Sequence, residues 1–170
     1  MNNECKYVLE DTLEYGQRLV ICGTAAGDTS AAKEYYYAGS GNKFWAILHK
    51  TKLTAQQLHP NEYKILKDYS IGLTDIVKDQ HGNDSKINFN NSQSNELRRK
   101  IILFKPKVLC FNGKEAAKRF FNKKAVDYGV CKEIIGDTIL YIAPSTSGLA
   151  AKWWDESFWH ELSGIVGDGK

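Results

Sequence analysis

The sequence has 170 residues, of which 42% are hydrophobic and 25% are charged, and its net charge is only +3. This length predicts one domain with a substantial core, because a chain of this size buries roughly 70% of its unfolded surface. Its apolar runs are far shorter than the roughly 20 residues that span a bilayer, and the first residues, MNNECKYVLED, lack an apolar signal core. We therefore expect a monomeric cytoplasmic protein with no membrane partner.

Strand-like and helix-like segments alternate along the chain. Apolar segments typical of buried strands lie at 18–23, 70–77, 107–113 and 138–144. Helical spacing of apolar residues occurs at 42–51, 60–69, 95–104, 114–123 and 155–166. The alternation predicts an α/β fold, a three-layer α/β/α sandwich with a central, mainly parallel four-stranded sheet. VCKEIIGDTILYIA can fold back as a hairpin at Gly136 and Asp137, and the polar segment 78–94 predicts a long, mobile loop.

The predicted topology brings four unusual loops to one edge of the sheet. Asp75 ends the second strand, NGK follows the third and PSTSGLAAK follows the fourth. Because ligands bind outside the carboxyl ends of parallel strands, these loops predict a cleft. The loop after the first strand carries almost no side chains, so that a ligand can approach its backbone closely, although a plain strand-to-helix turn would explain the same residues: Gly23, Thr24, Ala25, Ala26 and Gly27.

Aromatic residues lie beside this loop in the segment YYYAGSGNKFW. Tyr37 precedes the glycines, and its ring can stack on a flat base. Core packing is the alternative, and we favour it for the remaining aromatic residues: Tyr35, Tyr36, Phe44 and Trp45. Asn42 either caps the helix that follows or points its amide into the cleft.

The segment PSTSGLAAKWW supplies groups that can hold DNA phosphates. An apolar Leu149 at the tip can insert into a base stack. A loop leading into a helix is the alternative, and Trp153 and Trp154 are expected to pack. The candidate DNA-contacting residues are Ser145, Thr146, Ser147, Gly148, Leu149 and Lys152.

Other chemistries have little support in the sequence. There is no GxSxG or GxxxxGK[ST] motif, and the four histidines are isolated, so we expect neither a metal nor a cofactor. Basic segments such as LRRKIILFKPK permit a nucleic-acid partner. The cysteines lack CxxC spacing and are interpreted as reduced thiols rather than disulfide or zinc ligands: Cys5, Cys22, Cys110 and Cys131.

Five segments, in order, resemble the uracil-DNA glycosylase superfamily: ICGTAAGDTS, YYYAGSGNKFWAILHKTKL, GLTDIV, FKPKVLCFNGKEA and APSTSGLAA. The resemblance covers about residues 17–165 and is greatest to the mismatch-specific uracil and thymine glycosylases. It implies a single DNA glycosylase domain over residues 1–170, with DNA as partner at the nucleoid. Such an enzyme flips a damaged, mismatched or modified base out of DNA, hydrolyses its N-glycosidic bond and leaves an abasic site.

The resemblance also implies roles for individual residues. The segment 23–27 matches the loop under the flipped base, and Tyr37 matches the aromatic residue that stacks on it. Asp75 joins this base-binding set. PSTSGLAA matches the loop that grips the phosphates and inserts Leu149 into the vacated space. Lys114 is assigned to a DNA contact or a structural role rather than to a Schiff base.

One departure from the pattern concerns the attacking water. Ala25 stands where the mismatch-specific branch has the Asn that positions this water. The deoxyinosine-glycosylase branch also lacks that Asn and depends on the Asn before the FW pair, which Asn42 matches. Water activation therefore falls to Asn42 or Asp28. Three alternatives stay open: a glycosylase for a bulky modified pyrimidine in phage defence, a non-catalytic binder of damaged DNA, and a nucleotide or nucleoside hydrolase.

Overall fold

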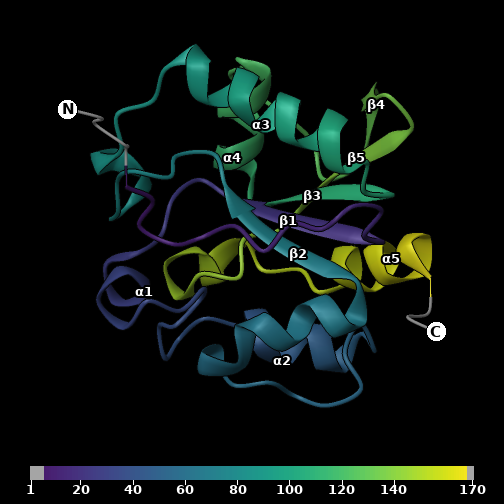
Figure 1. Ribbon diagram of the computed structural model, residues 1–170. Helices are drawn as coiled ribbons and strands as arrows, with labels where there is room; N and C mark the ends of the chain where they lie inside the picture. The colour runs from purple at the N-terminus through teal and green to yellow at the C-terminus, as the bar shows by residue number, and fades with distance from the viewer. Residues whose placement is uncertain (1–5, 168–170) are drawn as a thin grey trace.

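A single sheet lies between two layers of helices in the computed structural model, which describes residues 6–167 (Figure 1). Its five strands run in the spatial order β2-β1-β3-β5-β4. All neighbours pair in parallel except β4 and β5. The strands are β1 (Leu19–Gly23), β2 (Ile71–Asp75), β3 (Val108–Asn112), β4 (Gly129–Ile135) and β5 (Thr138–Ala143).

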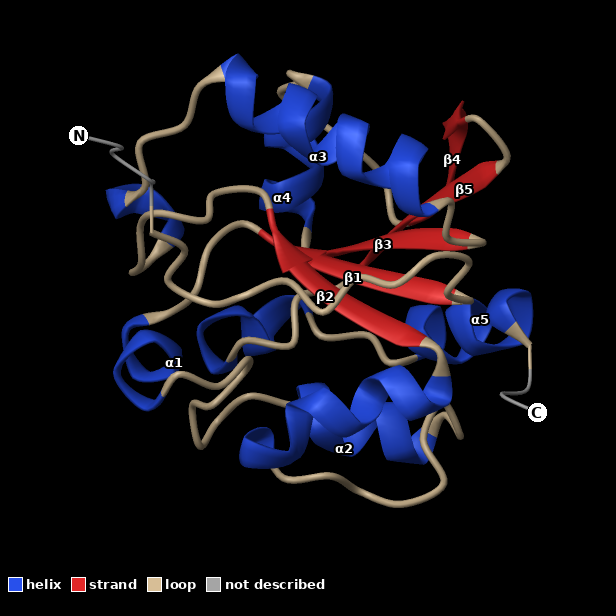
Figure 2. Ribbon diagram, in the orientation of Figure 1, coloured by secondary structure: helices blue, strands red, loops and turns tan. Residues whose placement is uncertain are grey.

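Helices cover both faces of the sheet, with α3 and α4 on one side and α2 and α5 on the other (Figure 2). The α-helices are α1 (Asp28–Lys33), α2 (Phe44–Lys50), α3 (Asn91–Phe104), α4 (Lys114–Phe121) and α5 (Ser157–Val166). Short 3-10 helices are η1 (Pro60–Tyr69), η2 (Asp84–Lys86) and η3 (Gly148–Trp153). The predicted α/β/α sandwich is therefore confirmed.

Alternation along the strands builds two separate cores. Leu19 and Ile21 of β1 pack with Trp159 in the cluster on the α2 and α5 side. Val20 and Cys22 of the same strand belong to the cluster on the α3 and α4 side. Because successive side chains point to opposite faces, a buried strand contributes to both cores and reads as a continuous apolar run.

Two predictions about the elements need correction. The sheet has five strands rather than four, because the hairpin at Gly136 adds β4 as an antiparallel edge strand. That strand has a polar, mostly exposed pattern, GVCKEII, which an apolar-run criterion misses. Helix α3 begins inside the segment predicted as a loop, where a reciprocal cap between Asn90 and Gln93 starts it before its apolar residues.

The N-terminal segment covers the outer edge of β2. Val8 N donates to Lys78 O at 2.7 Å, and Thr12 N donates to Leu73 O at 3.0 Å. Asp11 lies beside two lysines, with Lys78 Nζ at 2.8 Å and Lys100 Nζ at 2.6 Å. Burial alone would raise the pKa of Asp11, but the two lysines lower it below its ordinary value. This pairing holds the N-terminal segment against an edge that would otherwise expose unpaired backbone groups.

Candidate active site

The small-residue loop after β1 is fixed to the chain that follows β2. Ile76 N donates to Gly23 O at 3.0 Å and Val77 N to Thr24 O at 2.8 Å. Further along, Gly82 N donates to Ala26 O at 2.9 Å. These bonds hold segments 23–26 and 76–82 side by side at the carboxyl end of the sheet, as the topology predicted.

Asp75 is a buried carboxyl at the inner wall of this edge. It pairs with Gly23 across the β1–β2 ladder and is only 6% exposed. Burial raises the pKa of Asp75 to about 6, while nearby Lys78 opposes the rise. A carboxyl with this pKa can exchange a proton or a hydrogen bond near neutral pH, which favours a functional role over a purely structural one.

Tyr37 lies against Asp75 but is not free on both ring faces. Its ring stacks on Phe44 with centroids 3.9 Å apart. Its hydroxyl is buried and has no hydrogen-bond partner of good geometry among residues 6–167, although the Asn112 amide, which bonds Thr146 through both its oxygen and its nitrogen, lies nearby. Burial raises the pKa of this hydroxyl well above its usual range, and Asp75 adds to the rise. A stacking role for Tyr37 can therefore use only the ring face away from Phe44.

The backbone of Tyr37 is also held in an uncommon conformation. Its φ is 52°, in the left-handed region that a tyrosine rarely occupies. Trp45 Nε1 donates to Tyr37 O at 3.2 Å and so helps to retain it. Phe44 and Trp45 are both buried in the core, as predicted. Backbone strain of this kind costs on the order of 1–3 kcal/mol and tends to occur at functional sites.

Asn112, the last residue of β3, was not singled out by the sequence analysis. Its Nδ2 donates to Thr146 Oγ1 at 3.0 Å, and its Oδ1 accepts from Thr146 N at 3.0 Å. Thr146 is fully buried, so its predicted DNA contact cannot use its hydroxyl. Lys43 N donates to Thr146 O at 2.9 Å and joins the loop before α2 to this assembly. Asn112 could have been found from the sequence, because it lies at the end of a predicted strand.

The segment after β5 presents its tip to solvent. Ser147 Oγ accepts from Leu149 N at 3.2 Å and starts η3. Leu149 is 79% exposed, which an intercalating side chain requires. Trp153 is 60% exposed, so the expectation that it packs was wrong, whereas Trp154 does pack against the core. Ser145 and Lys152 lie on the same segment, at its start and in η3.

This segment lies against the loop before α2, and the two backbones approach each other closely at Gly148 and Gly41. A Cβ placed on Gly148 would lie 3.2 Å from Gly41 O. Asn42 follows directly, and its Oδ1 accepts from Phe44 N at 3.0 Å, which is a helix-start bond. Asn42 lies one residue before Lys43, the N-cap of α2, and contributes this bond to the helix start, while its Nδ2 makes no hydrogen bond to any residue within 6–167.

Asp28, the other candidate for water activation, lies in the first turn of α1 and is exposed. Its Oδ1 is 2.8 Å from Nδ1 of His81, a residue to which the sequence analysis assigned no role. Asp28 directly follows the loop after β1, and His81 lies on the neighbouring segment that is bridged to Ala26. The helix α1 itself was not predicted, because DTSAAK is short and polar.

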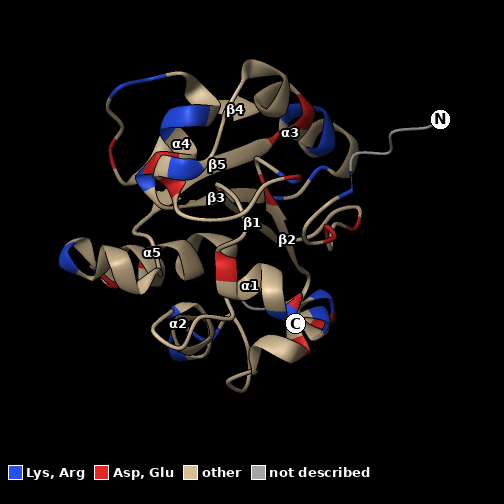
Figure 3. Cartoon of the chain, turned by 90° about the vertical axis from the view of Figure 1, so that its left-hand side faces the viewer, with Lys and Arg blue, Asp and Glu red and all other residues tan. Residues whose placement is uncertain are grey.

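Basic residues lie beside this edge. Figure 3 looks onto the carboxyl ends of the strands, and Lys and Arg gather there on α4 and the loop after it. Lys114 begins α4, with its Nζ 4.3 Å from the centroid of the Tyr128 ring. This cation–π contact gives Lys114 a structural partner and leaves its predicted DNA contact a prediction.

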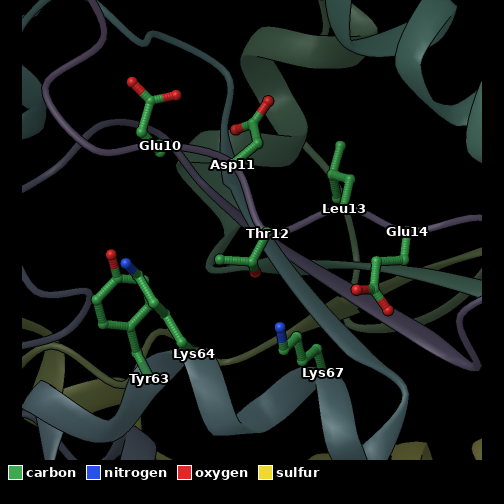
Figure 4. A pocket seen from close by; sticks show the side chains of 8 residues that line it. All are labelled: Glu10, Asp11, Thr12, Leu13, Glu14, Tyr63, Lys64 and Lys67. Carbon is green, nitrogen blue, oxygen red and sulfur yellow. The ribbon is translucent and has the colours of Figure 1, made fainter.

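The hollow drawn in Figure 4 belongs to a different part of the molecule. It has a volume of about 270 Å³ and is lined by Glu10, Asp11, Thr12, Leu13, Glu14, Tyr63, Lys64 and Lys67. These residues come from the N-terminal segment and η1, so the hollow shares no residue with the predicted site.

Cys22 and Cys110 are buried free thiols and Cys131 is a half-buried one, while Cys5 lies outside the described residues. Within residues 6–167, no group of three His, Cys, Asp or Glu side chains could hold a metal ion. No helix in the described part of the chain has the length and apolar character needed to cross a bilayer.

The fold is that of an α/β protein with a mainly parallel sheet, a class in which ligands bind outside the carboxyl ends of the strands. A family model described as the uracil DNA glycosylase superfamily matches residues 11–163. The chain belongs to this superfamily, whose members are DNA glycosylases.

A solved structure shares the fold. It is the solution NMR structure of a "putative Uracil DNA glycosylase" from Methanosarcina acetivorans, at 22% sequence identity and a TM-score of 0.61. The match covers 94% of this chain and 97% of the other.

Proposed function

We propose that the protein is a monofunctional DNA glycosylase that excises a uracil-type or deaminated base flipped out of DNA and leaves an abasic site. The observation that carries this proposal is the buried Asp75 carboxyl beside Gly23 and Tyr37, at the edge where the superfamily places its base. Uracil and hypoxanthine share a ring N–H next to a carbonyl group. A carboxylate accepts a hydrogen bond from such an N–H, so Asp75 suits both bases.

The loop at 23–27 supplies the second requirement. Cleavage of the glycosidic bond develops positive charge on the sugar and negative charge on the departing base. Backbone amides of the loop are suited to stabilise that negative charge, and one such donor typically contributes about 2.7 to 4 kcal/mol. The ladder from Gly23 to Ala26 holds this backbone in place before the substrate arrives.

The remaining candidates act on the water and the DNA. Asn42 would orient the attacking water through its Nδ2, because its Oδ1 is engaged by the start of α2. Leu149 would fill the space that the flipped nucleotide leaves, with phosphates held by Ser145, Ser147 and Lys152. Unstacking a paired base costs a few kcal/mol, which such a wedge offsets.

A panel of oligonucleotides with one altered base each tests the proposal. Uracil, mismatched thymine, hypoxanthine and a bulky modified pyrimidine are presented in duplex and single strands, and abasic sites are revealed by alkaline cleavage. We expect cleavage after alkali at uracil or hypoxanthine. Strand scission without alkali would contradict a monofunctional enzyme.

The same panel separates the alternatives. Activity confined to the bulky pyrimidine would replace the proposed substrate class. Tight binding of abasic DNA with no base release would indicate a non-catalytic binder. Ala25 supports this alternative, because it replaces the Asn that positions the water in the mismatch-specific branch. Release of base from free nucleotides but not from DNA would indicate a nucleotide hydrolase.

A further inference from the structure

The proposed reaction needs a proton acceptor that the first loop does not provide. Ala25 has no polar group, and Asn42 carries an amide, which can orient water but cannot take its proton. Asp75 is buried beneath the loop on the β2 side. A residue on the segment that flanks the 23–27 backbone can supply such an acceptor, and the side chains of Asp84, which bonds Thr24, and His81 both lie on that segment.

His81 is held beside that backbone by the main chain. A parallel bridge joins Ala26 to His81, and the next residue, Gly82, donates its N–H to Ala26 O at 2.9 Å. The φ of Gly82 is +125°, a conformation that favours glycine and fixes where the chain turns. The backbone of His81 is thus paired with Ala26, the neighbour of Ala25, the position at which the superfamily pattern would place a water-binding side chain.

Asp28 orients the ring of His81. Its Oδ1 lies 2.8 Å from His81 Nδ1, and because a carboxylate can only accept, the proton of this bond belongs to Nδ1 and a neutral ring then has its lone pair at Nε2. The His81 and Asp28 side chains are 53% and 68% exposed, so the pair is open to solvent. A carboxylate in this position also stabilises the imidazolium that forms when Nε2 takes a proton.

We propose that His81 is the general base of the glycosylase reaction and that Asp28 is its positioning residue. This inference rests on the proposed function. The water oxygen forms a bond to C1′ while the C1′–N bond breaks and its electron pair leaves with the base. One water proton passes to His81 Nε2 and afterwards neutralises the base anion, so the products are a free base and an abasic sugar.

A surface His–carboxylate pair elsewhere in the chain provides a matched control. His160 and Glu156 on α5 and its N-cap lie 3.7 Å apart and are 48% and 39% exposed. Exposed pairs of this kind usually contribute little to stability. His160→Gln therefore removes an imidazole of similar exposure without touching the loop after β1.

The test is single-turnover base release by His81→Gln, His81→Ala and Asp28→Asn, with DNA affinity and thermal unfolding measured alongside. We expect His81→Gln to be slowed about 100-fold or more, with DNA affinity and melting temperature near wild type. Added imidazole should restore part of the rate of His81→Ala. Asp28→Asn should be slowed less than His81→Gln. Asp28→Glu, which keeps a carboxylate, should be faster than Asp28→Asn. The control His160→Gln should release base at the wild-type rate.

The outcomes distinguish a failure of the His81 proposal from a failure of the proposed glycosylase function. Wild-type protein that releases no base overturns both. Active wild-type protein together with an equally fast His81→Gln overturns the role of His81 alone. A slow His81→Gln that binds DNA weakly, with no rescue of His81→Ala by imidazole, makes His81 a DNA contact and overturns its role as base.

Discussion

Gly23 and Asp75 face each other across β1 and β2 so closely that a Cβ on Gly23 would lie 2.7 Å from Asp75 Oδ1. Real Cβ atoms do not approach an oxygen this closely, so a side chain at position 23 and the present place of the carboxyl exclude each other. The first strand therefore ends in bare backbone because a buried carboxyl occupies the space beside it.

Gly23→Ala should lower both stability and base recognition. The added methyl group must displace Asp75, and overpacking of this kind costs about 1–3 kcal/mol. Chemical denaturation gives the free energy of unfolding. Gly164→Ala is the matched control, because no atom lies within 4 Å of a Cβ there and the residue is in α5, so a small gain in stability is expected. Equal effects at the two positions would contradict the steric account.

Asp75→Asn should change how stability depends on pH. Burial raises the pKa of Asp75 to about 6 in the folded chain, against about 3.9 for an unfolded aspartate. The folded state therefore binds this proton more tightly, so the contribution of Asp75 to stability is fully present below pH 4 and is lost as pH rises through about 6.

The variant lacks this titration. Relative to wild type, its free energy of unfolding should increase between pH 4 and pH 7 by an amount on the order of 3 kcal/mol. Urea denaturation at intervals of half a pH unit measures the difference. Two curves that stay parallel over this range would show that Asp75 does not titrate as described.

Two substitutions at Tyr37 separate the contribution of its ring from that of its hydroxyl. Tyr37→Phe keeps the stack on Phe44 and removes a buried hydroxyl that makes no hydrogen bond, so stability should hold or rise by about 1 kcal/mol. Tyr37→Ala should lose about 1 to 3 kcal/mol of base recognition, measured as affinity for DNA holding an unpaired target base. Identical behaviour of two folded variants would remove the ring from the recognition site.

Leu149→Ala should impair excision from a well-paired duplex more than from single-stranded DNA, because only the duplex must be unstacked. Single-turnover rates on the two substrates give the ratio. Ile134→Ala is the control, since Ile134 is 62% exposed on the edge strand β4, away from the carboxyl ends. A Leu149→Ala protein that loses the same factor on both substrates has lost a general DNA contact rather than a wedge.

The sequence predicted the elements whose burial is continuous and missed those whose signals are local. β1 and β3 are apolar on both faces and could be located by composition. β4 is mostly exposed and α1 is short and polar, and they depend on pairing with β5 and on the loop after β1. The turn at Gly136 and Asp137 indicated the hairpin, but the exposed residues of its first strand gave no apolar run by which to count a fifth strand.

Some residues of the candidate site were predicted from the sequence and others were not. Asp75 and Tyr37 were predicted from strand ends and glycines, and the structure brings them together. His81 was interpreted as isolated because its partner, Asp28, is 53 residues away in sequence. Thr146 was predicted to contact DNA because hydroxyls in such a loop can hold phosphates, whereas its side chain is buried and bonds Asn112.

Two substitutions of Asn42 separate its bond at the start of α2 from its proposed role in orienting water. Its Oδ1 accepts from Phe44 N at the start of α2, and its Nδ2 is the group assigned to the water. Asn42→Ala removes both, so it should lose about 0.5 to 2 kcal/mol of stability as well as the catalytic contribution. Asn42→Asp keeps an oxygen acceptor for the helix start and removes only the amide donor. We expect Asn42→Asp to unfold near the wild-type temperature while its single-turnover rate falls about 100-fold or more at saturating protein, where any loss of DNA affinity from the added charge does not enter. An Asn42→Asp protein as fast as wild type, beside an Asn42→Ala protein that is fast but less stable, would reduce Asn42 to a helix cap.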